Sequence, residues 1–149
     1  MNDRELLLNF RKDIRIRRIA ICEILSFVGV IIIKGVLRPM HLGLSDTGIF
    51  LMGTLPNFFA AMGFVALFFL ISELHSDKVA FLKSSAARLN ASTALTIVGL
   101  SVWEVIETLF GSRIDPYDIA MTIAGSLCSY LFIQLAWHRI KVSSNFMMH

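Results

Sequence analysis

Long apolar runs separated by short polar connections dominate the pattern of this chain. A helix that crosses a bilayer needs about 20 mostly apolar residues, because each residue rises about 1.5 Å. Stretches of this kind cover residues 19–37, 55–74, 91–110 and 117–137. Backbone groups in lipid must be satisfied within their own segment, so each continuous apolar run predicts a helix. The pattern therefore predicts an all-α protein, a four-transmembrane-helix bundle in which residues 19–141 form a single membrane domain.

Two flanking segments complete the predicted organisation. Residues 1–18 form a basic arm in which Leu7, Phe10 and Ile14 share one helical face, as expected for an amphipathic segment on anionic lipid. The alternative is that this arm only fixes the topology. Residues 142–149 are predicted to form a short cytoplasmic tail. The first apolar run lacks a small-x-small cleavage site after it, which favours an uncleaved helix over a signal peptide.

Composition and charge support a membrane protein and narrow its partners. Hydrophobic residues make up 56% of the chain, charged residues 17%, and the mean hydropathy is +0.70, which is too apolar for an ordinary soluble domain. The net charge of +3 does not indicate nucleic-acid binding, because the basic residues flank apolar runs and no recognition motif accompanies them. No spacing matches a calcium loop or a zinc site, so no cofactor and no metal are expected.

Basic residues are distributed unequally between the connections. The arm, the middle connection and the segment after residue 137 carry six, three and two of the 14 Lys and Arg residues, whereas the other two connections carry only Arg38 and Arg113 and Lys34 lies inside the first run. Segments rich in Lys and Arg stay in the cytoplasm. The sequence therefore predicts a multi-pass protein of the cytoplasmic (inner) membrane with both termini in the cytoplasm.

Small residues and a proline predict details of the bundle. Each apolar run carries a glycine near its middle, and glycines let membrane helices approach closely; these glycines are Gly29, Gly63, Gly99 and Gly125. Pro56 is expected in the first turn of the second helix with Thr54 as its cap. Residues 49–53 would then lie at the outer interface.

Ionisable residues inside the predicted helices are the first candidates for chemistry, because a charge in the membrane costs about 2.5–3.5 kcal/mol on insertion scales. Lys34 and Glu104 lie at similar depths, about 5 and 9 Å from the outer boundary. They are expected to form an ion pair between the first and third helices. The pair would either fix the register of the helices or line a polar pocket open to the outside.

Glu104 and Glu107 are the candidate catalytic residues. They are three residues apart and share one face of a helix. Two carboxylates in a low dielectric do not both ionise cheaply, which indicates acid/base chemistry or a structural role with a nearby cation. The outer side also receives Arg38, His41, Asp46 and Asn57.

Four further residues are candidates for ligand binding at the same outer side. Arg38 and Arg113 could hold an anionic head group. Asp115 precedes Pro116 and is expected to cap the fourth helix, while Asp118 follows in its first turn. Both aspartates are also candidate ligand residues.

The stretch from Trp103 to Gly125, WEVIETLFGSRIDPYDIAMTIAG, resembles the signature of VanZ-like small bacterial membrane proteins. The residues that carry the resemblance are Glu104, Glu107, Arg113, Asp115, Asp118 and Gly125, together with the segment 53–57. Glu107 and Thr122 stand where that family commonly has Gln and Asn. The resemblance implies a role in the cell envelope, linked to resistance against teicoplanin-type glycopeptide antibiotics.

Two functions remain open from the sequence. In the first, the outer polar site binds or processes an amphipathic envelope molecule or membrane lipid. In the second, the chain is an accessory or scaffolding subunit that docks on a partner membrane protein, and its charges only set the helix register. A self-assembling pore is disfavoured, because no apolar run carries a continuous polar stripe.

The predicted topology can be tested with reporter fusions. A reporter that works only in the cytoplasm should be active when it is fused after His149, since Arg139 and Lys141 follow the fourth run. A reporter placed in the connection around residue 113 is the matched control and should be active only outside. Activity of the His149 fusion on the outer side would contradict the topology.

Overall fold

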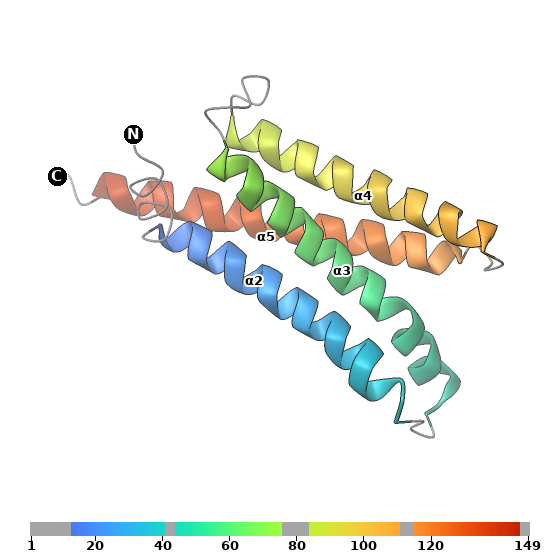
Figure 1. The fold of residues 1–149 in the computed structure, drawn as a ribbon. Coiled ribbons are helices and arrows are strands. Elements are labelled where there is room, and N and C mark those ends of the chain that lie inside the picture. The colour runs from blue at the N-terminus through green and yellow to red at the C-terminus, as the bar shows by residue number, and fades with distance from the viewer. Residues whose placement is uncertain (1–12, 41–43, 76–83, 111–114, 147–149) are drawn as a thin grey trace.

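A computed structural model describes residues 13–40, 44–75, 84–110 and 115–146, with the backbone alone at 108 and 138–146. These residues form long helices and no strand (Figure 1), so the prediction of an all-α four-helix bundle is confirmed. Helix α2 (Ile14–Ile31) continues into a π-helical segment η1 (Ile32–Leu37), followed by α3 (Asp46–Leu74), α4 (Ser85–Leu109) and α5 (Pro116–Phe146). Each of the four is long and apolar enough to span a membrane.

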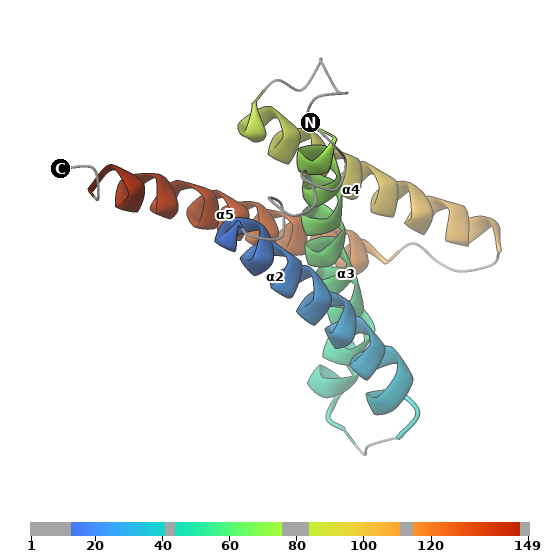
Figure 2. The ribbon, with the colours of Figure 1, turned by 60° about the vertical axis from the view of Figure 1, so that its left-hand side comes forward.

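Helix α3 is the helix on which the others pack. It contacts α2, α4 and α5, and α2 and α4 lie on opposite sides of it (Figures 1 and 2). Consecutive helices run in opposite directions. The start of α2 and the end of α5 therefore lie at one end of the bundle, here named the terminal end, and the ends of η1 and α4 lie at the other, the distal end.

Several helices begin earlier than predicted, because polar residues upstream cap them. The Asp13 carboxylate accepts a hydrogen bond from Arg15 N at 2.9 Å, so residues 14–18 of the predicted arm belong to α2. Ser45 caps α3 and Ser84 Oγ accepts from Ala87 N at 3.1 Å. Residues 1–12 of the arm lie outside the described residues. At the other terminus α5 runs to Phe146, so most of the predicted tail is helical.

The predicted place of Pro56 is wrong. Pro56 lies eleven positions into α3 rather than in its first turn, because Ser45 starts the helix at Asp46. Residues 49–53 are therefore helical rather than an interfacial segment. Thr54 is not a cap, and its hydroxyl donates to Phe50 O at 3.2 Å within the same helix.

The described core is small and close to the terminal end. Its buried residues come from all four helices and are Ile19, Val65, Ala66, Phe69, Leu70, Leu89 and Ile133. The buried hydroxyls of α4 donate to carbonyls four residues back in their own helix; they are those of Ser92, Thr93 and Thr96. In α5 the buried Ser129 donates to Met62 O of α3 at 3.0 Å, and the buried Ser126 Oγ has no hydrogen-bond partner among the described residues.

One ion pair joins two helices at the terminal end, and another lies at the start of α2. Arg88 of α4 binds Glu73 of α3 through two hydrogen bonds of 2.9 Å, and both side chains are nearly buried. Arg15 pairs with Asp13, and its guanidinium lies 4.5 Å from the ring of Trp137. The hydrogen bonds from Arg15 hold the pKa of the Asp13 carboxyl below its ordinary value. The basic residues that follow the positive-inside pattern are thus partly built into the fold.

Three of the four predicted contact glycines lie at helix contacts. A side chain at Gly29 or Gly63 would press on the rings of Phe59 or Phe27, and a Cβ at Gly125 would overlap the carbonyl oxygen of Phe58. Gly99 faces open space. At Gly125 the backbone of α5 therefore lies directly against the backbone of α3, where there is no flexible side chain to move aside.

Replacement of Gly125 tests this close contact. Gly125→Ala should destabilise the protein by about 1–3 kcal/mol, because the added methyl group displaces backbone rather than a side chain. Gly99→Ala is the matched control, since it lies inside α4 with nothing near, and should leave stability unchanged or raise it by up to about 1 kcal/mol. Thermal unfolding in detergent measures both. Equal stability of the two variants would contradict the contact.

Candidate functional site

Three helices bring polar side chains together towards the distal end. Asn57 of α3 donates from its amide nitrogen to Glu104 Oε1 of α4 at 3.3 Å. The same amide interacts with the carboxylate of Asp118, from α5. The group formed by Asn57, Glu104 and Asp118 is named the carboxylate site below. It joins three residues that are far apart in the sequence.

The start of α5 is built to place Asp118. Asp115 accepts a hydrogen bond from Tyr117 N at 2.9 Å, which confirms its predicted capping role, and its carbonyl accepts from Asp118 N. Pro116 follows as the first helical residue, where a missing N–H costs nothing. The rings of Tyr117 and Phe50 meet edge to face with centroids 5.1 Å apart, which ties the start of α5 to the start of α3.

Asp118 has an unused acceptor. Its Oδ1 atom is buried and has no hydrogen-bond partner among the described residues. Asp115 and Glu107 are close enough to repel the Asp118 carboxylate, and Arg38 is close enough to attract it. A buried oxygen without a donor costs free energy. A donor on a bound molecule would remove that cost.

Glu104 and Glu107 have different surroundings although they share a helix face. Glu104 accepts a hydrogen bond from Asn57, and the negative charges of Asp118 and Asp115 repel its carboxylate. Glu107 accepts a hydrogen bond of 2.7 Å from the indole nitrogen of Trp103, one turn earlier on an exposed face. Glu104 thus belongs to the carboxylate site, whereas Glu107 lies at its edge.

Arg38 has a structural task that the sequence did not predict. Pro56 has no N–H to donate to Met52 O, four residues back, and a proline ring also disturbs the carbonyl next to it. Arg38 donates to Met52 O at 3.1 Å and to Gly53 O at 3.0 Å. The guanidinium therefore satisfies carbonyls at the proline break. The π-helical turn that ends at Leu37 brings Arg38 to this place.

The expected ion pair between Lys34 and Glu104 does not form. Lys34 is exposed on η1, and the ion pairs of the described residues are Asp13–Arg15 and Glu73–Arg88. The prediction was based on the similar depths of Lys34 and Glu104 in the membrane. The prediction was wrong because α3 lies between the helices that carry the two residues (Figure 1).

Other predicted residues fall outside this geometry. Arg113 and His41 lie outside the described residues. The described part of the chain has no group of three or more His, Cys, Asp or Glu side chains able to hold a metal ion. Asn57 was placed on the outer side by the sequence but was not chosen as a site residue. An amide inside an apolar helix, one position after a proline, was the signal that could have identified it.

Comparison with known proteins returned no matching family model, no matching curated protein and no matching solved structure. The argument for function therefore depends on the residues and their arrangement.

A double-mutant cycle tests the link between Arg38 and Pro56. Arg38→Ala should destabilise the protein by the order of 1 kcal/mol, since two carbonyls lose their donor. In a Pro56→Ala background the same change should cost clearly less, because the alanine introduced there has an N–H that can bond to Met52 O. Thermal unfolding of the four proteins in one detergent gives the coupling. An equal cost of Arg38→Ala in both backgrounds would show that Arg38 does not serve the break.

Proposed function

We propose that the carboxylate site binds the polar head group of an amphipathic molecule of the cell envelope. The observation that carries the proposal is the buried Asp118 Oδ1 without a donor, beside Glu104 and Asn57. The site lies between helices that are long and apolar enough to span the bilayer, so a ligand with an apolar tail reaches it from the membrane.

The charges of the site favour a head group that donates hydrogen bonds or carries positive charge. Glu104, Asp115 and Asp118 provide acceptors, and Arg38, the cation that acts on Asp118, already donates to two carbonyls of α3. A hydroxyl, amide or ammonium group complements this arrangement better than a phosphate does. This proposal therefore replaces the anionic head group expected from Arg38 in the sequence.

Glu104 is the residue proposed to exchange a proton with the ligand, with Glu107 beside it at the edge of the site. Glu104 shares the site with the Asp118 carboxylate, and neighbouring carboxylates in a low dielectric hold a shared proton more readily than isolated ones do. Binding of the head group requires only the carboxylate oxygens as hydrogen-bond acceptors. Catalysis would also require a proton transfer at Glu104.

The proposed setting is the inner membrane, with both termini in the cytoplasm and the distal end facing outward. The uneven distribution of Lys and Arg supports this orientation. The resemblance to VanZ-like proteins supports an envelope role and a change in susceptibility to teicoplanin-type glycopeptides, and several of its residues are those of the carboxylate site and its border.

Isosteric amides test the proposal. Glu104→Gln and Asp118→Asn should each abolish the change in glycopeptide susceptibility that the wild-type protein confers on a host, because the acceptor and charge are lost while the shape is kept. Glu107→Gln should have a smaller effect. Susceptibility of the host and the amount of folded protein, measured by detergent gel filtration, are the readouts.

Glu23→Gln is the matched control, since it removes a carboxylate from α2 far from the site, and it should behave as wild type. If Glu104→Gln and Asp118→Asn also behave as wild type in a host where the unmodified protein acts, the carboxylates are structural. Sensitivity to an enlarged Gly63 together with a stoichiometric partner in mild detergent would then favour the scaffolding function.

A further inference from the structure

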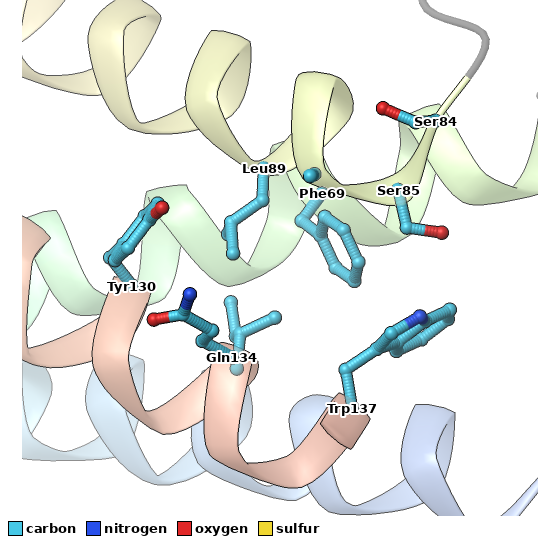
Figure 3. Close-up of a pocket in the computed structure, with 9 residues that line it drawn as sticks. Phe69, Ser84, Ser85, Leu89, Tyr130, Gln134 and Trp137 are labelled. Atoms are coloured by element: carbon cyan, nitrogen blue, oxygen red, sulfur yellow. The ribbon is translucent and has the colours of Figure 1, made fainter. Parts of the chain in front are cut away.

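A cavity lies at the terminal end, away from the carboxylate site. It has a volume of about 260 Å³ and is bordered by α3, the start of α4 and residues 130–137 of α5 (Figure 3). Pockets that hold drug-sized ligands measure about 300–1,000 Å³. This cavity can therefore enclose part of a molecule, while the remainder lies outside it.

The lining of the cavity changes from apolar to polar. Phe69, Leu89 and Ile133 form an apolar floor that belongs to the core of the bundle, and all three are buried. Ser84 and Gln134 stand at an exposed rim. Figure 3 shows the Gln134 amide and the Tyr130 ring on α5, facing Leu89 across the cavity. This gradient matches an amphipathic ligand.

Donor groups at the cavity are available to a ligand. Tyr130, Gln134 and Trp137 each carry a donor in the side chain, and none of the three bonds to another described residue through it. Ser84 accepts from Ala87 N, which leaves its own hydroxyl proton to be donated. Phosphate and ester oxygens accept such hydrogen bonds.

The terminal end has the depth and charge of a membrane surface. Tyr130 and Trp137 line the cavity, and Tyr and Trp commonly lie where lipid meets water. Asp13 and Glu73 are already paired with Arg15 and Arg88, while Arg17 and Arg18 are exposed on the first turns of α2. The surplus charge is positive and attracts anionic lipid.

We propose that this cavity binds one anionic phospholipid from the leaflet around the terminal end. The glycerol end of one acyl chain lies on Phe69, Leu89 and Ile133, and the ester and phosphate groups accept from Ser84, Gln134 and Tyr130. The second acyl chain stays in the bilayer, against exposed leucines of α5 such as Leu131 and Leu135. This site is independent of the carboxylate site and of the function proposed for it.

Quenching of Trp137 fluorescence by brominated lipids tests this proposal. The chain has two tryptophans, so Trp103→Phe leaves Trp137 as the only reporter, inside the cavity lining. The full chain is reconstituted into phosphatidylcholine vesicles with increasing fractions of phosphatidylglycerol, and either lipid carries the bromine. We expect half-maximal quenching at an about fivefold lower fraction of phosphatidylglycerol than of phosphatidylcholine.

Variants separate this site from general attraction to the surface. Ala86→Phe fills the rim of the cavity and Gln134→Leu removes a donor, and each should raise the half-maximal fraction of phosphatidylglycerol about threefold or more. The matched controls Ala94→Phe and Asn90→Leu are exposed positions of α4 outside the cavity and should have no effect.

Equal quenching by the two lipids would overturn the preference for an anionic head group. A preference for phosphatidylglycerol that Ala86→Phe and Gln134→Leu leave unchanged would mean surface attraction without a site, and would overturn the proposal. Gln134 is exposed, so its variant keeps the test valid even if Ala86→Phe lowers the unfolding temperature. A partner helix in the cavity would shield Trp137, so that neither brominated lipid quenches its fluorescence in a complex isolated from membranes. That result would also overturn the proposal.

Discussion

The close contact between the backbones of α3 and α5 determines the geometry of the distal half of the bundle. At Gly125 the two helices approach until the Phe58 carbonyl lies where a side chain would be. Asn57 is the residue before Phe58, and Asp118 lies about two turns before Gly125 on α5. The contact therefore sets the distance at which the Asn57 amide meets Asp118. Glu104 of α4 then completes the carboxylate site by accepting a hydrogen bond from Asn57.

The break at Pro56 is the second determinant, because it lies directly before Asn57. A proline inside a helix leaves carbonyls without donors, and in a membrane the surrounding protein must satisfy them. Arg38 does so from the end of η1, at Met52 O and Gly53 O. The arginine also lies close enough to Asp118 to attract its charge. One side chain therefore stabilises the break in α3 and balances part of the negative charge of the site.

Much of the fold followed from the sequence, because apolar runs of this length in lipid allow only helices. Gly29, Gly63 and Gly125 were also predicted at contacts, since close approach needs a small residue. The ion pair of Lys34 with Glu104 was not predictable from depth, because depth does not tell which helices are neighbours. The place of Pro56 was missed because Ser45, a better cap than Thr54 in this fold, lies outside the apolar run. Asn57 was identified as a site residue only from the structure, in which α3 places it beside Glu104 of α4 and Asp118 of α5.

The carboxylates at the two ends of the bundle have different partners. This difference supports the proposal that the ligand binds at the distal end. At the terminal end Asp13 and Glu73 each have an arginine partner, and Glu73 is nearly buried with its pair. At the distal end Glu104, Glu107 and Asp118 take part in no ion pair within the described residues, although a carboxylate inside a membrane-spanning segment is costly. Carboxylates that served only to hold helices together would be stabilised by partners of the kind found at the terminal end. In the proposed function, the Asp115 cap and the Asn57 amide hold these acceptors in place, and a donor on the ligand bonds to the buried Asp118 Oδ1.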